Sequence, residues 1–321
     1  MTAPDHPHGL LAAEAAHARG SALTVRQIFR RRFLRHGLAV GSLTFLVLLG
    51  LASAAAPLVE HYLGVDGNLV DLFNARQPPS AAHPLGTDEL GRDLLVRLLY
   101  GGQVSLVVGL AAALCAAVIG TLLGLSAGYY GGRLDSLLMR FTDGVIALPI
   151  LPLLIILAAI DLGKLGLPQS VVGSESVSIY RIVFLIALVG WTTVARLVRG
   201  ATLTMKTREF VRAAEALGAS APRIMLVHIL PNVVSPIIVA TTLSIGGIVL
   251  LESVLSFLGL GIQPPLPSWG NMLTSAQELI WDSPALAIYP GLLIFVTVIA
   301  FNFLGDGMQD ALDPRALHRE D

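Results

Sequence analysis

The sequence has 321 residues, of which 54% are hydrophobic and only 13% charged, and its net charge is −1. An average soluble domain carries about 25% charged residues, so this chain has more apolar side chains than a soluble core could bury. The composition therefore predicts a protein embedded in a lipid bilayer, and the balanced charge gives it no general attraction to nucleic acid.

Six apolar runs are each long enough to cross the hydrocarbon layer as a helix, which takes about 20 residues. The runs do not show the short alternating pattern of membrane β-barrel strands. The predicted fold is therefore an all-α integral membrane protein with six transmembrane helices. The predicted spans are Leu38–Val59, Val104–Tyr129, Thr142–Ile160, Ile182–Val198, Ile229–Leu251 and Ala285–Leu304.

The positive charges are unevenly divided between the two sides of these spans. If the crossings alternate, sixteen of the 21 Lys and Arg residues fall on the side that holds both termini and the loops after the second and fourth spans. Loops rich in Lys and Arg stay in the cytoplasm. We therefore expect a multi-pass protein of the cytoplasmic membrane with both termini in the cytoplasm. No cleavable signal peptide is expected, because the first apolar run starts only near His36.

The segments outside the spans have their own patterns. The chain should begin with a cytoplasmic tail that ends in an amphipathic helix at Leu23–Arg35, whose arginines contact anionic lipid. A helix capped by Thr87 or Asp88 is expected from Asp88 to Tyr100. Further along, Trp269 is expected to anchor at the membrane interface. The expected divisions are a tail and interfacial helix at 1–36, a first transmembrane helix at 37–59, an extracytoplasmic segment at 60–103, a membrane core at 104–305 with a cytoplasmic loop at 199–228, and a cytoplasmic tail at 306–321.

The loop at 199–228 is the largest predicted cytoplasmic feature. An alanine-rich stretch predicts a short helix that ends at Leu217, and Gly218 stands where a helix C-cap needs a residue free to take a positive φ. Ser220 is expected to cap a second helix that carries Pro222 in its first turn and runs to His228. We expect this helix–glycine–helix element to act as a lever held by another protein, since small alanines let a partner approach the backbone closely.

This loop resembles the EAA motif of ABC-importer permeases, whose general form is E-A-A-x-x-x-G-x9-I-x-L-P. Arg212-Ala213-Ala214, Gly218 and Leu230-Pro231 fall at that spacing, although Arg212 replaces the glutamate and His228 replaces the isoleucine. Other stretches resemble the C-type subunit of dipeptide and oligopeptide permeases. They are His83–Asp93, Glu252–Gly261 with the following Pro264-Pro265 and Ser268–Gly270, and Gly305–Arg315.

The resemblance implies the core of a type I ABC-importer permease, five helices preceded by one N-terminal helix. It implies import of di- or oligopeptides, or alternatively of nickel or another small solute. The implied partners are a second, B-type permease subunit, two ATPase subunits and an extracytoplasmic substrate-binding protein. ATP and Mg²⁺ would bind the ATPase subunits, because this sequence has no P-loop motif and is not expected to be an enzyme. The residues implied to couple to the ATPase are Arg212, Ala213, Ala214, Glu215, Leu217, Gly218, Ala219, Pro222 and Pro231.

Candidates for the transport pathway follow from residue chemistry. Ionisable groups at membrane depth are functional candidates by default, which singles out Glu252 and Asp143. The alternatives are structural: Glu252 would satisfy backbone donors where its helix ends, and Asp143 would interact with a helix start and with Arg140. Pro149 and Pro152 either open backbone carbonyls to the pathway or only kink a packed helix.

Two rival classes remain. One is a secondary transporter that needs no ATPase, against which stands the near-absence of charge at mid-membrane. The other is an intramembrane hydrolase built on Ser126, whose Gly-x-Ser-x-Gly pattern lies in an apolar helix without a partner base. His6 and His8 lack a third ligand, so no metal site is predicted, and the single Cys115 excludes an intrachain disulfide.

Overall fold

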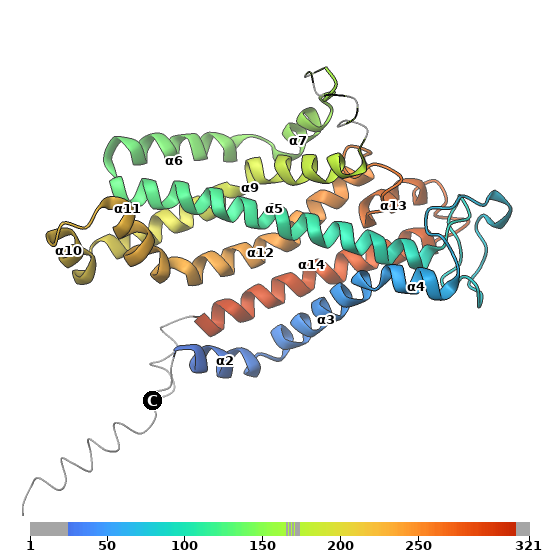
Figure 1. Ribbon diagram of the computed structural model, residues 1–321, viewed down its shortest axis with the longest axis horizontal. Coiled ribbons are helices and arrows are strands. Elements are labelled where there is room, and N and C mark those ends of the chain that lie inside the picture. The colour runs from blue at the N-terminus through green and yellow to red at the C-terminus, as the bar shows by residue number, and fades with distance from the viewer. Residues whose placement is uncertain (1–24, 165, 167, 169, 171–173, 313–321) are drawn as a thin grey trace, which may run out of the picture.

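The computed structural model describes residues 25–164, 166, 168, 170 and 174–312, and its long helices run along one common axis (Figure 1). The described chain starts and finishes at the end of the bundle that carries α10 (Glu209–Ala216), and α4 (Ala56–Leu63) lies at the opposite end (Figure 1). Five described helices are long and apolar enough to cross a membrane, or six if one bent pair counts as a span. The all-α membrane fold is thereby confirmed; His6, His8 and residues 313–321 lie outside the described residues.

The first apolar run forms two helices rather than one. A helix α2 (Val25–Arg35) precedes it, as the amphipathic pattern predicts, and α3 (Gly37–Ala54) and α4 then meet at Ala55. The imidazole Nδ1 of His36 caps α3 by accepting a hydrogen bond from the Ala39 N–H at 3.2 Å. α3 packs on α5 and on α14, so the first span touches the core through these two helices.

The second span is longer than predicted, because α5 (Leu94–Tyr130) also includes most of the stretch expected to form a separate helix. The predicted start of that helix is wrong. Asp93 caps α5 by accepting a hydrogen bond from the Val96 N–H at 2.8 Å. Asp88 instead closes the turn before it, where its carboxylate accepts from the Leu90 and Arg92 N–H groups, each at 2.9 Å.

The third span is broken into α6 (Gly132–Ala147) and α7 (Ile150–Ala158), which are bent by 85° relative to each other. The predicted span at 142–160 is therefore wrong at its start, whereas the interruption expected at its prolines is present as the break between Ala147 and Ile150. Proline disfavours a helical conformation in the residue before it, so α6 stops ahead of Pro149. Pro152 lies in the first turn of α7, where a backbone N–H would have no partner within the helix in any case.

The remaining spans also extend past their predicted limits. The helix after Gly218 does not stop at His228, since residues Ala221–Phe257 form one continuous apolar helix with a π-helical turn inside it. The last helix continues past Leu304 into the segment expected to be a tail. The bounds are α9 (Glu175–Lys206), α11 (Ala221–Arg223), the π-helical turn Ile224–Ile229, α12 (Leu230–Phe257), α13 (Trp269–Ala276) and α14 (Ala285–Leu312).

Close contact between α5 and α9 depends on a row of glycines. A Cβ added at Gly124 would lie 2.6 Å from the carbonyl oxygen of Ala195, and one at Gly120 would lie 2.6 Å from that of Trp191. Backbone atoms cannot yield as side chains do, so only glycine fits. Ser126 sits in the same helix and donates its hydroxyl to the Leu122 carbonyl at 2.8 Å, which fits packing and not a nucleophile elbow.

Replacing Gly124 with valine should separate α5 from α9 and lower the free energy of unfolding by about 1–3 kcal/mol, the usual cost of overpacking. Thermal unfolding of the detergent-solubilised protein measures the loss. Gly247→Val is the matched control, because nothing lies within 4 Å of a Cβ at Gly247. Equal melting temperatures for the two variants would contradict the packing of α5 on α9.

Candidate functional site

The predicted helix–glycine–helix element, here called the lever, is present as a hydrogen-bonded turn between two helices. α10 ends at Ala216 with Leu217 as its C-cap, and Gly218 follows with a φ of 78°. The Gly218 N–H donates to the Glu215 carbonyl at 2.9 Å, and the Ala219 N–H donates to the Ala214 carbonyl at 3.0 Å. This pair of bonds is a Schellman motif, which requires a left-handed residue at the glycine position. The structure thus gives Gly218 the conformation that the sequence predicts.

The second half of the lever differs in part from the prediction. Ser220 precedes α11, but its side chain makes no capping hydrogen bond, so that expected role is wrong. Pro222 does lie in the first turn. The π-helical turn then leads directly into α12, where Pro231 lacks the N–H that a regular helical bond would use. The helix is therefore unbroken from α11 through α12.

The outer and inner faces of α10 have different surroundings. Val211 and Ala214 are buried, and Val211 belongs to an apolar cluster with Ile224 and Ile229. This contact fixes α10 to the start of the α11–α12 helix. The exposed side presents a large apolar side chain, Leu217, which is 89% exposed. Of all the coupling candidates, the exposed ones are Arg212, Ala213, Glu215, Leu217, Gly218, Pro222 and Pro231, whereas Ala214 is buried and Ala219 half-buried.

Glu252 lies inside α12, and its side chain is completely buried. Its carboxyl group accepts hydrogen bonds from Ser256 Oγ at 2.7 Å and from Ser105 Oγ of α5 at 3.0 Å. These hydroxyls accept in turn from backbone N–H groups, that of Ile262 at 3.0 Å and that of Trp269 at 3.3 Å. The expected contact of Glu252 with backbone donors is therefore indirect, and two serines mediate it.

Trp269 is fully buried, so the expected anchor at the membrane interface is wrong. Its indole Nε1 donates to the Leu98 carbonyl of α5 at 3.0 Å. Its ring lies so close to α5 that a Cβ added at Gly101 or Gly102 would come within 3.2 or 3.0 Å of it. The tryptophan therefore fastens α13 to α5.

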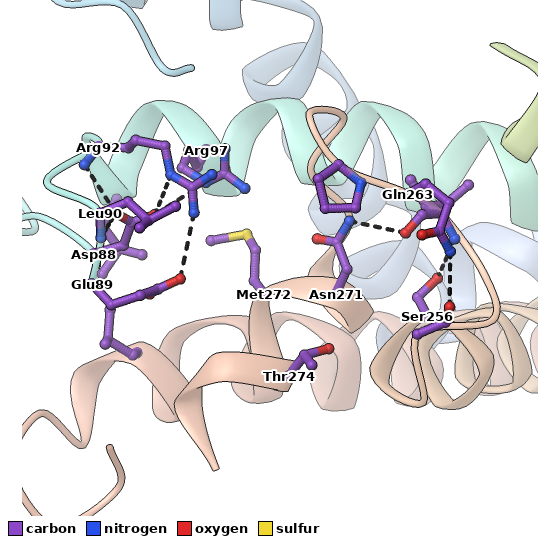
Figure 2. Close-up of a pocket in the computed structure, with 15 residues that line it drawn as sticks. Asp88, Glu89, Leu90, Arg92, Arg97, Ser256, Gln263, Asn271, Met272 and Thr274 are labelled. Atoms are coloured by element: carbon purple, nitrogen blue, oxygen red, sulfur yellow. Dashed lines mark hydrogen bonds and ion pairs between the residues drawn. The ribbon is translucent and has the colours of Figure 1, made fainter. Parts of the chain in front are cut away.

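A cavity of about 300 Å³ lies beside this network, between the start of α5 and the segment that connects α12 to α13 (Figure 2). At one end, Asp88 contacts Arg92 at 2.7 Å and Arg97 at 3.4 Å, and Glu89 contacts Arg92 at 3.5 Å. Figure 2 shows Arg97 facing Met272 of α13 across the cavity. Two acids and two arginines balance in charge here, and their bonds hold the turn before α5 in place. Its lining residues come from segments far apart in the sequence, so no local pattern predicts this cavity.

Asp143 has a different position and partner from those predicted. It lies in the last part of α6 instead of at a helix start, and it pairs with Arg196 of α9 rather than with Arg140. A second ion pair joins the same helices, in which Arg199 binds Asp135 through both carboxylate oxygens, with Nη2–Oδ2 at 2.6 Å. The partners are more than 50 residues apart in sequence, which is why the sequence alone did not reveal the pairs.

Two family models match this chain. Residues 120–318 match the family described as binding-protein-dependent transport system inner membrane component, and residues 24–79 match the N-terminal transmembrane domain of oligopeptide transport permease C. The chain is 41% identical to a glutathione transport system permease protein of Pectobacterium atrosepticum, over 89% of this chain and 90% of the relative. It is 38% identical to an oligopeptide transport system permease protein of Haemophilus influenzae (89% and 87% covered) and 37% identical to one of Bacillus subtilis (88% and 88%).

Proposed function

The chain belongs to the family of binding-protein-dependent transport system inner membrane components, the permeases of ABC importers, and on that premise we propose that it imports di- or oligopeptides. The relatives named above serve oligopeptide and glutathione transport, and the similarity covers nearly nine tenths of the chain. We place the α10 end and both termini in the cytoplasm, because this end carries most of the Lys and Arg residues.

The observation that carries the proposal is the α10–Gly218–α11 lever and its unbroken connection to α12. Two ATPase subunits would dock on the internal loops of the two permease subunits, and ATP with Mg²⁺ would bind to those ATPase subunits. A B-type permease subunit would complete the pathway, and an extracytoplasmic binding protein would deliver the peptide.

In the mechanism we propose, ATP closes the two ATPase subunits on each other, and their movement pulls α10. Because Val211 and Ala214 bury the inner face of α10 against neighbouring helices, the pull passes to α9 and α12. These helices then tilt and change which side of the membrane the pathway opens to, a rigid-body rearrangement of packed helices.

Purification of this chain with its chromosomal neighbours tests the function. We expect a second permease and P-loop ATPases to co-purify, with ATP hydrolysis stimulated by a peptide-loaded binding protein and peptide uptake by proteoliposomes. If the proteoliposomes take up labelled Ni²⁺ and no peptide, the protein is still an ABC-importer permease, but its substrate is nickel and not a peptide. Solute movement by this chain alone, without ATP, would support a secondary transporter and discard the proposal.

A further inference from the structure

One face of α9 changes character along its length. Seven residues on this face are spaced three or four positions apart, so they lie in one row along the helix. The first three are buried apolar side chains, and the last four are exposed and contain two threonines, a glycine and an arginine. The row is Ile182, Ile186, Val189, Thr193, Arg196, Gly200 and Thr204.

Arg196, in the exposed half of this row, lies at membrane depth. Arg196 comes between the levels of Gly120 and Gly124 in the apolar part of α5, since added Cβ atoms there would lie 2.9 and 3.0 Å from the N atoms of Ala195 and Arg199. It also lies about 15 Å before the end of α9 at Lys206, at 1.5 Å per residue. A charged side chain at this depth is costly against lipid and normally faces a water-filled cavity.

Helices α5, α6 and α12 contact this half of α9. α5 covers the opposite face, through the glycine contacts described above. α6 lies on one side and supplies Asp143. α12 lies on the other side, where Asn232 and Thr204 line a cavity of about 660 Å³ at the α10 end. Asp143 and Arg196 do not line this cavity, which lies closer to the side that we place in the cytoplasm.

The two ion pairs between α6 and α9 differ in exposure. The side chains of Asp135 and Arg199 are 15% and 34% exposed, and those of Asp143 and Arg196 are 60% and 49% exposed. An ion pair in contact with water contributes little, because solvent competes for both charges. The Asp143–Arg196 pair can therefore open at low cost, whereas the Asp135–Arg199 pair fastens α6 to α9.

We propose that Arg196 receives the carboxylate of the permeating solute and that Asp143 holds the guanidinium between transport cycles. This inference rests on the proposed peptide import, since every unmodified peptide carries a C-terminal carboxylate. The planar guanidinium fork matches a carboxylate with two parallel hydrogen bonds. The solute's carboxylate takes the place of Asp143, whose own carboxylate is then unpaired and is solvated by the water of the pathway; its side chain is 60% exposed. Asp143 is thus a positioning residue for Arg196.

The test uses proteoliposomes that contain the complete importer and its binding protein. Uptake of radiolabelled trialanine should fall about tenfold in Arg196→Gln, the effect of losing one charge-assisted contact. In the same variant, uptake of trialanine with an amidated C-terminus should fall much less relative to the wild type, because this peptide has no C-terminal carboxylate to lose a contact. The same binding protein serves both variants, so its own preference cancels from the comparison. Arg196→Lys should restore part of the uptake, since it keeps the charge and loses the fork.

A charge swap separates recognition of the solute from a structural bond. The double variant Asp143→Arg, Arg196→Asp restores the ion pair but moves the cation to α6, so uptake should stay low. Asp135→Asn, the control, should lower thermal stability and change uptake of the free and amidated peptides by the same factor. Full uptake by the swap variant, or an equal loss for both peptides in Arg196→Gln, would overturn the inference.

Two further outcomes are decisive. If Arg196→Gln releases the second permease during purification, Arg196 is a subunit contact and the inference is wrong. If the wild-type importer transports neither form of trialanine or any other peptide, the proposed function fails first. If the wild type transports peptide and Arg196→Gln keeps the same preference for the free over the amidated peptide, the role of Arg196 is rejected and the proposed peptide import still stands.

Discussion

Replacing Gly218 with valine should abolish ATP-driven uptake while the importer remains assembled. Gly218 has a φ of 78°, and the Schellman motif at the end of α10 needs that left-handed conformation. A β-branched residue there costs about 1–3 kcal/mol of backbone strain. No atom lies within 4 Å of a Cβ at this position, so the effect is one of conformation and not of steric overlap. The turn should open, α10 should lose its angle to α11, and movement of the ATPase subunits should no longer reach α12.

Two controls separate the turn from a general effect of side-chain size. Gly218→Asn should retain most uptake, because asparagine tolerates the left-handed region. Gly50→Val adds the same side chain at a helical glycine with equally open surroundings and no positive φ, and it should be neutral for coupling. The measurements are peptide uptake and ATP hydrolysis by the same proteoliposomes. Normal uptake by Gly218→Val would reject the lever mechanism.

Local sequence patterns predicted the features that are determined by residues close together in the chain. The Gly218 turn follows from residue preference within eight positions, and the apolar runs follow from the length needed to cross a bilayer. The limits of the helices were less predictable. α5 begins at Leu94 because Asp93 caps it. Thr87 and Asp88 are equally suitable N-cap residues by type, so the sequence does not distinguish them from Asp93. Only the folded turn shows that Asp88 is engaged with Arg92 and with the backbone.

Contacts between distant segments could not be read from the sequence. Ser105 and Glu252 are 147 positions apart, and nothing local shows that α5 brings a hydroxyl to this carboxyl group. Trp269 has the amphipathic character of an interfacial residue, yet the folded chain buries it, because Gly101 and Gly102 leave room for its ring. The same holds for Asp143, whose nearest basic residue in sequence is not its partner in space.

Replacing Glu252 with alanine should be among the most destabilising single substitutions in this chain. It leaves the hydroxyls of Ser105 and Ser256 without their acceptor, and each buried group left unpaired costs about 1–3 kcal/mol. The backbone N–H groups of Ile262 and Trp269 depend on the same hydroxyls. The connection between α12 and α13 should therefore loosen. Thermal unfolding of the purified importer, together with protease cleavage between residues 259 and 268, measures both effects.

Neighbouring serines provide the matched comparison for this network. Ser253 and Ser256 are both buried, but Ser253 Oγ donates to the Val249 carbonyl at 2.8 Å and lies 3.4 Å from Glu252. Ser253→Ala should thus cost little, whereas Ser256→Ala should reproduce much of the loss seen in Glu252→Ala. If Glu252→Ala instead stays as stable as the wild type and loses only uptake, Glu252 acts in the pathway. Because its carboxyl group is fully enclosed and bonded to two helices, we expect loss of stability and not selective loss of uptake.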